Sequence, residues 1–227
     1  MPSKRYKEVQ TKVDKDKIYT IEEAITLVKQ TATAKYDEAI ELHVRLGTDP
    51  SKSDQQVRGT ITLPHGTGKS KRVAAFVEAA KEAEAKEAGA DIIGSEELIA
   101  KIAQKGELDF DVAVATPTMM PKIAKLARLL GPRGLMPNPK TDTVGTNVKK
   151  MVTEQKAGKQ SFKNDNTGNI HQVFGRASFD EAKLTENLNL LIETIGRMKP
   201  AVTKGIFIKG ATIASTLGPG IKIEINN

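Results

Sequence analysis

Hydrophobic and polar residues alternate along two stretches in the first third of the chain. Residues 40–46 are apolar at the even positions and polar at 41, 43 and 45. In residues 56–63 the odd-numbered positions form a mostly apolar face and the even-numbered positions are mostly polar. A two-residue period is typical of a strand that buries one of its faces, so each stretch predicts a half-buried β-strand.

Helical signals precede and follow these strands. Thr20 is followed three residues later by Glu23, and Ser178 by Glu181, in both cases ahead of apolar residues at helical spacing. Side chains at this spacing can pair with the free amides of a first helical turn. We therefore predict helices from residue 20 to about 33 and from 178 to 197, in addition to a short basic helix within residues 3–14.

The pattern changes between about residues 67 and 158, where short apolar segments alternate with helical ones. Strands are expected at residues 73–77, 91–93 and 112–115, and helices at 78–88, 96–105, 117–130 and 146–157. Strands and helices that alternate in this way predict a parallel sheet of Rossmann-like type with right-handed crossovers. Residues 131–140 hold two glycines and three prolines, which predict a rigid irregular loop.

From residue 159 the chain returns to the pattern of its first third. Strands are expected at residues 160–163 and 170–174 around a hairpin turn, and at 205–211 and 221–225 around a bend. The predicted fold is thus a two-domain α+β protein. A discontinuous α+β domain, residues 1–66 and 159–227, is interrupted by an inserted α/β domain, residues 67–158, with paired hinges near 64–68 and 158–160.

The amino-acid composition excludes several kinds of site. The chain of 227 residues has no cysteine, which excludes disulfides and thiolate metal sites and fits a cytoplasmic location. Its net charge of +7 favours a polyanionic partner, nucleic acid before membrane, although an ordinary basic protein is an equal alternative on charge alone. No apolar run approaches membrane-spanning length, and the N-terminus does not have the pattern of a secretory signal.

Catalytic and metal sites find little support in the sequence. His43, His65 and His171 have no paired spacing, so surface or structural roles are favoured over metal binding. The segment that ends in Lys69 and Ser70 resembles a phosphate-binding loop, but its first glycine is replaced by Leu63. We predict no catalytic residue, no metal and no cofactor. The alternative is a Rossmann-like nucleotide-binding enzyme or NTPase that uses Lys69 and Ser70.

Two loops of the discontinuous domain indicate RNA. The hairpin turn 164–169 and the bend 215–220 present small hydroxyl and amide side chains, with glycines that let an RNA backbone approach closely. Such groups can contact ribose 2′-hydroxyls, which distinguish RNA from DNA. Turn formation alone is an equally good explanation of their composition. Tyr36, at the start of a strand of the same domain, could stack on a base or pack against the protein.

These segments resemble bacterial ribosomal protein L-one, a family of the large-subunit mobile stalk, over nearly the whole chain. The resemblance is carried by residues 36–41, 54–69, 129–140, 164–171 and 216–219, in the same order as in the family. The Gly/Pro loop at 131–140 is the most specific of them, because few folds tolerate such a run. The chain departs from the family at Tyr36, commonly phenylalanine, and at Leu217, commonly methionine.

The resemblance implies a non-enzymatic RNA-binding protein of the ribosome. Its expected partners are the 23S rRNA of the mobile stalk, the exit-site tRNA whose release it assists, and its own operon mRNA, whose translation it represses. The resemblance places the RNA contacts on Tyr36, Glu41, Lys163, Thr167, Gly168, His171, Ser215, Thr216, Leu217, Gly218 and Pro219. Replacing Thr216 or Gly218 is expected to lower RNA affinity with nearly unchanged melting temperature.

Overall fold

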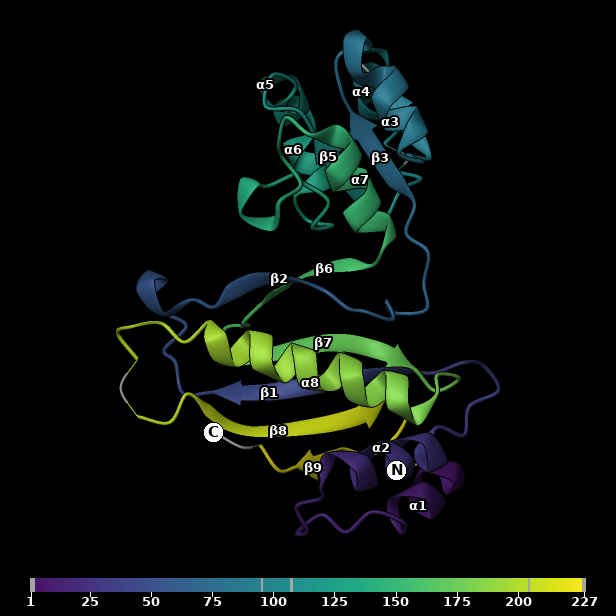
Figure 1. Ribbon diagram of the computed structural model, residues 1–227, viewed down its shortest axis with the longest axis vertical. Helices are drawn as coiled ribbons and strands as arrows, with labels where there is room; N and C mark the ends of the chain where they lie inside the picture. Colours follow the sequence, from purple (N-terminus) through teal and green to yellow (C-terminus); the bar gives the residue numbers. More distant parts are fainter. Residues whose placement is uncertain (1–2, 95, 107, 204, 226–227) are drawn as a thin grey trace. The chain divides into compact units, whose positions relative to one another are not determined.

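The computed structural model describes residues 3–94, 96–106, 108–203 and 205–225 (Figure 1). The chain divides into two compact units. The first combines both ends of the chain, Met1–Gly68 with Ser161–Asn227, and the second is the segment Lys69–Gln160. The structure contains both a parallel sheet and antiparallel sheets, as expected for the α+β class.

The first unit is built on a four-stranded antiparallel sheet with the order β7-β1-β8-β9. Its strands are β1 (Ala39–Leu46), β7 (Asn169–Arg176), β8 (Ile208–Ser215) and β9 (Ile221–Ile223). The central strand, β1, pairs with β7 on one side and with β8 on the other, although these partners lie more than a hundred residues further along the chain. Residues from both ends of the chain therefore meet in one sheet.

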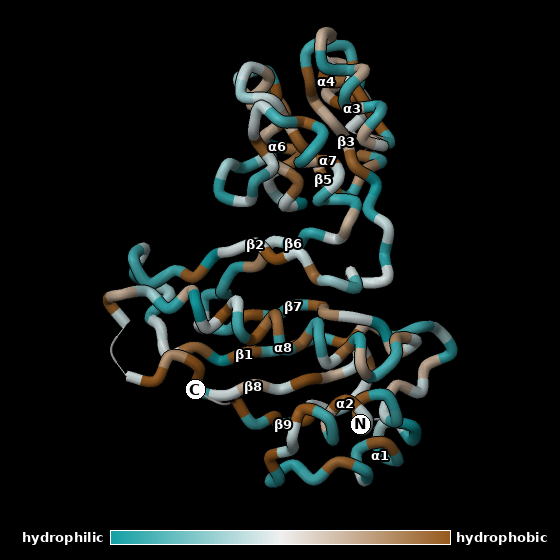
Figure 2. The backbone as a smooth tube through the Cα atoms, in the orientation of Figure 1, coloured by the Kyte–Doolittle hydropathy of each residue, from teal (hydrophilic) through white to brown (hydrophobic). Residues whose placement is uncertain are grey.

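Helices cover one face of this sheet. They are α2 (Ile21–Thr31) and α8 (Glu181–Arg197), and α1 (Lys4–Gln10) precedes them. Hydrophobic residues recur along the coiled tube of α8 in Figure 2, and its buried leucines join the even-numbered residues of β1 in one hydrophobic core. Burial of this face leaves the odd-numbered residues of β1 on the opposite side.

A separate two-stranded sheet joins β2 (Arg58–Thr62) to β6 (Lys159–Lys163). Where the pairing ends, the buried side chain of Asn164 accepts a hydrogen bond from the Val57 amide at 3.0 Å, and the Asn164 amide donates to the Val57 carbonyl at 3.0 Å. Asn164 thus fixes the start of the hairpin turn that leads into β7.

The second unit is a three-stranded parallel sheet with the order β4-β3-β5. Its strands are β3 (Val73–Phe76), β4 (Ile92–Gly94) and β5 (Val112–Ala115), and its helices are α3 (Glu82–Glu87), α4 (Glu96–Lys105), α5 (Met120–Ile123), α6 (Ala127–Leu130) and α7 (Val148–Lys156). Val73 and Ala75 lie in one hydrophobic cluster, Ala74 and Phe76 in another. Both faces of β3 are therefore buried, as is usual for a parallel sheet.

Short 3-10 helices complete the described part of the chain, at η1 (Ser53–Gln55), η2 (Ala79–Lys81), η3 (Ala124–Leu126) and η4 (Pro139–Thr141). The helix expected at 117–130 is divided by η3 and begins only at Met120. Pro121 explains this later start, because proline lacks the amide hydrogen and fits only the first turn of a helix.

The predicted cap of α8 is also corrected by the structure. Asp180, not Ser178, is the N-cap residue of this helix. The Ser178 amide and hydroxyl donate instead to the carboxylate of Asp37, at 3.0 and 2.8 Å. The strand expected at 205–211 runs from Ile208 to Ser215, because its pairing with β1 continues to that residue.

One buried side chain fixes the chain after β2. Asn187, on α8, is fully buried; its amide nitrogen donates to the Phe174 and Gly66 carbonyls at 2.8 and 3.1 Å, and its oxygen accepts from the His65 amide at 3.2 Å. We expect Asn187→Leu to lower the free energy of unfolding by about 1–3 kcal/mol, because it leaves buried backbone groups without partners. Urea unfolding measures the change.

Asn189→Leu is the matched control, since Asn189 lies on the same helix and is exposed. This control should change the free energy of unfolding by no more than about 0.5 kcal/mol. Equal losses in the two variants would contradict a special role for the buried asparagine.

Candidate nucleic-acid interface

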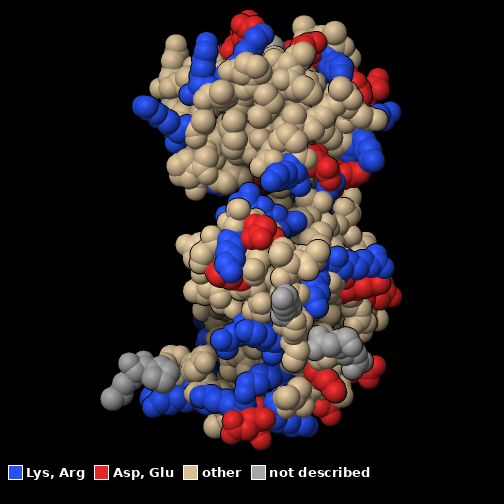
Figure 3. All heavy atoms as spheres, turned by 90° about the vertical axis from the view of Figure 1, so that its left-hand side faces the viewer, with Lys and Arg blue, Asp and Glu red and all other residues tan. Residues whose placement is uncertain are grey.

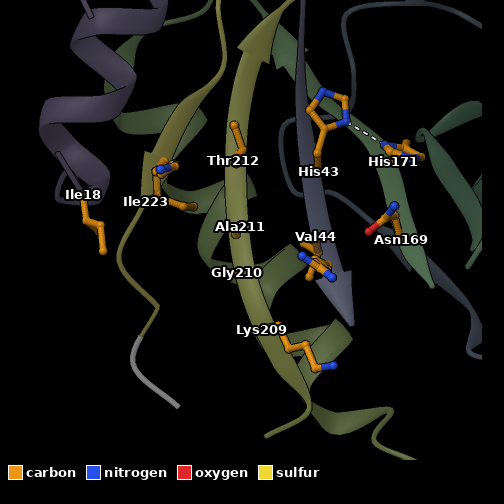
Figure 4. Close-up of a pocket in the computed structure, with 12 residues that line it drawn as sticks. Ile18, His43, Val44, Asn169, His171, Lys209, Gly210, Ala211, Thr212 and Ile223 are labelled. Carbon is orange, nitrogen blue, oxygen red and sulfur yellow. Dashed lines mark hydrogen bonds between the residues drawn. The ribbon is translucent and has the colours of Figure 1, made fainter. Parts of the chain in front are cut away.

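The open face of the four-stranded sheet carries a band of polar side chains. The register across β7, β1 and β8 places His43 opposite His171 and Thr212, and Arg45 opposite Asn169 and Gly210. Figure 4 shows the groove that these residues line, with a volume of about 530 Å³, to which β9 adds Lys222. The groove lining combines basic and polar side chains with apolar ones such as Ile18, and its cations suit an anionic partner.

At one end of β1 a bend, residues 215–220, connects β8 to β9. The Leu217 amide donates to the Glu38 carboxylate at 2.9 Å, and the Ala34 amide donates to the other oxygen of the same carboxylate at 2.8 Å. Glu38 is only 1% exposed. The Arg5 guanidinium donates to the Leu217 carbonyl at 3.0 Å and to the Thr33 hydroxyl at 2.9 Å. The bend is therefore held in one conformation.

The charge of Glu38 is favoured by this environment. Burial acts to raise the pKa of the carboxyl, but hydrogen bonds from the Leu217 and Ala34 amides and the nearby charge of Arg5 outweigh burial and lower the pKa. Glu38 is accordingly ionised at neutral pH, and its charge strengthens the hydrogen bonds that hold the bend.

Other residues of the bend are occupied within the protein. The Thr216 hydroxyl accepts from the Ala39 amide at 3.1 Å, and the Thr216 amide donates to the Ala39 carbonyl at 3.0 Å. Ser215 and Pro219 are buried. A Cβ atom on Gly218 would lie 2.5 Å from the Ser215 hydroxyl oxygen. These contacts lead us to expect that substitutions of Thr216 or Gly218 cost stability, in place of the nearly unchanged melting temperature expected from the sequence.

Two large apolar side chains remain exposed at this end of the sheet. Tyr36 is 54% exposed and lies two residues before Glu38; Leu217 is 45% exposed, and its amide donates to the Glu38 carboxylate, which anchors the bend. Exposed aromatic and aliphatic surface on a rigid support is what unstacked RNA bases pack against. Glu41, on β1, points to the open face of the sheet and is partly exposed.

The hairpin turn forms at the other end of β1. Asp165 accepts from the Asn169 amide at 2.8 Å, the Thr167 amide at 2.9 Å and the Thr167 hydroxyl at 2.8 Å. These hydrogen bonds lower the pKa of Asp165 to about 2. Gly168 has φ +81°, which favours glycine, and its carbonyl accepts from the Leu46 amide at 2.9 Å.

The predicted contacts thus fall into separate groups. Tyr36, Glu41 and the bend lie at the start of β1, whereas the hairpin turn lies at its end. β1 has eight residues, so these ends are about 23 Å apart. Lys163 is exposed beside the hairpin turn, and His171 lies between the two groups, on the open face. One compact ligand cannot touch both ends, but an extended one can.

Some residues of this face were not predicted from the sequence as RNA contacts. His43, Arg45 and Lys222 line the groove, and the alternation in residues 40–46 already pointed the first two to the polar side. The register of β1 against β7 could not be predicted from the sequence. That register brings the Nδ1 atoms of His43 and His171 to 2.8 Å, although the two histidines have no paired spacing in the sequence.

The glycine-rich segment before Lys69 does not have the surroundings of a phosphate-binding loop. Gly66 and Gly68 have positive φ, at 61° and 74°, and Asn187 holds Gly66 in place. The next element after Lys69 and Ser70 is the strand β3, whereas a phosphate-binding loop leads into a helix whose N-terminus faces the phosphates. This geometry weighs against the nucleotide-binding alternative.

The fold and the site define an α+β protein whose antiparallel sheet has an open face with polar side chains and a loop at each end of β1. A face of this kind is suited to nucleic acid. The sequence profile of the Ribosomal protein L1p/L10e family matches residues 28–219. The chain therefore belongs to this family.

Curated relatives match the chain over nearly its full length. The "Large ribosomal subunit protein uL1" of Kosmotoga olearia is 58% identical over 98% of this chain and 96% of its own length. The proteins of the same name from Fervidobacterium nodosum and Corynebacterium glutamicum are 54% and 52% identical, over 99% and 98% of this chain and 95% and 94% of their own lengths. None of the described helices is both long enough and apolar enough to span a membrane.

The Glu38 anchor gives a stability prediction. Glu38→Gln supplies one acceptor oxygen in place of two, so either the Ala34 or the Leu217 amide loses its partner. We expect the free energy of unfolding at pH 7 to fall by about 1–3 kcal/mol, measured by urea unfolding. Glu41→Gln is the control, because Glu41 lies on the open face of the sheet, and it should cost no more than about 0.5 kcal/mol. Similar losses would refute the anchor.

The hairpin turn gives a pH prediction. The pKa of Asp165 is lowered from 3.8 to about 2, so its ionised form stabilises the native state fully above pH 3.8 and progressively less as the pH falls toward 2. Asp165→Asn should therefore reduce stability at pH 7 and converge with the wild type near pH 2. Urea unfolding at several pH values measures both. Asn166→Ala, at an exposed neighbour, should show a pH-independent difference; a gap for Asp165→Asn that persists at pH 2 would contradict the assignment.

Proposed function

We propose that this protein is a constituent of the large ribosomal subunit that binds the 23S rRNA of the mobile stalk. The observation that carries the proposal is the open polar face of the sheet, with a rigidly held loop at each end. Membership of the Ribosomal protein L1p/L10e family and the names of the curated relatives support it. In this proposal the protein acts by binding, without catalysis.

Each group of residues has a distinct part in this binding. Tyr36 and Leu217 offer exposed apolar surface to bases, Glu41 offers its carboxylate to ribose hydroxyls, and Thr216 holds the bend through its hydrogen bonds to Ala39. Ser215, Gly218 and Pro219 shape the bend that presents Leu217. At the other end of β1, Thr167 and Gly168 form the turn beside Lys163. His171, on the open face, continues the contact between the two ends.

Charge supplies a background that does not depend on sequence. The chain carries a net charge of +7, and Figure 3 shows several lysine and arginine side chains close together on the first unit. Contacts of these cations with phosphates would release counterions, so affinity should fall as salt rises. Selectivity for one RNA shape would come instead from the rigid loops, since their groups cannot adjust to a different backbone.

The proposal has two further parts. The same face would bind a similar RNA shape in the protein's own operon mRNA and so repress its translation, and the protein would assist the release of deacylated tRNA from the exit site. The proposed RNA-binding domain comprises residues 1–66 and 159–227, and residues 67–158 form the inserted domain. Because one face serves both RNAs, stalk rRNA and operon mRNA should compete for it.

Exposed apolar residues allow binding to be tested apart from folding. We expect Tyr36→Ala and Leu217→Ala each to weaken binding of stalk rRNA by about 5–150-fold, the equivalent of about 1–3 kcal/mol per stacked base. Both side chains are about half exposed, so the melting temperature should change little. Filter binding to stalk rRNA and to an unrelated hairpin, at several salt concentrations, gives affinity and selectivity.

Val202→Ala is the matched control, since Val202 is 54% exposed and follows α8, a helix on the covered face of the sheet. It should leave RNA affinity within twofold of the wild type. Equal affinity of the wild type for stalk rRNA and the unrelated hairpin, or unchanged binding in both Tyr36→Ala and Leu217→Ala, would overturn the proposed function.

A further inference from the structure

The imidazoles of His43 and His171 meet in the middle of the open sheet face. They are direct partners across β1 and β7, and their Nδ1 atoms lie 2.8 Å apart, as the dashed line in Figure 4 shows. Two ring nitrogens at this distance share a single proton, so at least one lone pair points at the other ring. Both side chains are accessible from the groove, at 33% and 51% exposure.

Each imidazole has a carboxylate near its other nitrogen. Nε2 of His43 lies 4.0 Å from a Glu41 oxygen, and Nε2 of His171 lies 3.5 Å from an Asp165 oxygen. These distances are longer than hydrogen bonds, so each carboxylate acts through its charge, which favours a proton on Nε2. A histidine that ligates a metal ion usually donates its second ring N–H to a carboxylate, a carbonyl or water, and these carboxylates lie on the correct side of each ring for that role. The arrangement occurs here twice, with both Nδ1 atoms converging.

We propose that His43 and His171 form a binding site for a divalent transition-metal ion, with zinc as its reference ligand, held between their two Nδ1 atoms. The ion would replace the shared proton. With Zn–N bonds of about 2.05 Å in tetrahedral geometry, the nitrogens would separate to about 3.3 Å, about half an ångström more than at present. Rotation of the two imidazole rings would supply that movement.

The rest of the coordination shell is open. Among the described residues, no group of three or more His, Cys, Asp or Glu side chains is placed to hold a metal ion, so the remaining positions would be filled by water or by an anionic oxygen. Arg45 and Lys222 line the same groove and favour the anionic oxygen.

The third histidine provides a matched control. Nε2 of His65 lies 2.6 Å from a Glu186 oxygen, so His65 also has a carboxylate partner. The other two histidines, on β1 and β7, pair with each other and not with His65. The chain also has no cysteine, so no thiolate competes for zinc. Binding can therefore be assigned to one pair of residues. The proposal is independent of the proposed RNA function, because the site is tested on the free protein.

The test is a zinc chloride titration of the full chain at pH 7.5, followed by calorimetry and by NMR of the histidine rings. The ring signals of His43 and His171 should move together while those of His65 stay in place. His43→Asn and His171→Asn should each lower zinc affinity by more than tenfold, and His65→Asn by less than twofold. Zinc affinity should also fall at acidic pH, because protons compete for the same nitrogens.

Two results would overturn the site. One is a loss of less than tenfold in either the His43 or the His171 variant, and the other is movement of the His65 signals in parallel with the rest. Circular dichroism establishes that each variant is folded. Should one variant not fold, the ring signals of the wild-type protein decide the question alone, since they report directly which imidazoles the zinc contacts.

Discussion

The pairing of β1 with β7 on one side and β8 on the other is the interaction on which the first unit depends. Both partners come from the C-terminal part of the chain, and β1 lies between them. Because side chains alternate along a strand, this single pairing builds the core on one face and the polar groove on the other. It also brings the bend to one end of β1 and the hairpin turn to the other. A register shift of one residue would exchange the two faces.

Local pattern was sufficient to predict the elements but not their partners. The alternation in residues 40–46 predicted β1 and the side to which its polar residues point, and the second unit's alternation of strands and helices predicted a parallel sheet. The His43–His171 contact could not be predicted in this way, because it depends on the register between β1 and β7, which brings together two residues 128 positions apart. Nothing in either local sequence encodes that register; it follows from which faces are buried.

The burial of Glu38 is a second feature that could not be predicted from the sequence. In the segment from Tyr36 to Glu41, Glu38 is one of three acidic residues and resembles a solvated surface side chain. Its burial follows from the arrival of the bend, whose Leu217 amide needs an acceptor away from water. Glycine and proline in the bend predicted a turn, but the anchor is supplied by a carboxylate almost two hundred residues closer to the N-terminus. A polar residue's role is therefore decided by the backbone groups that folding leaves unpaired.

The difference between residues that support the bend and residues that are exposed on it affects how binding residues are recognised. Thr216 and Gly218 carry the family resemblance, yet the hydroxyl of the first bonds the Ala39 backbone and a side chain on the second would meet Ser215. Changing either would disturb the loop and its contacts together, so loss of affinity would not distinguish a contact from a support. Tyr36 and Leu217 differ, because half of their surface faces solvent and stabilises nothing within the chain. Rigid supports lower the entropic cost of ordering a loop on binding, and exposed side chains then provide the contact itself. A residue that carries the family resemblance can therefore support the loop, as Thr216 does through Ala39, and its hydrogen bonds, not its exposure, reveal this role.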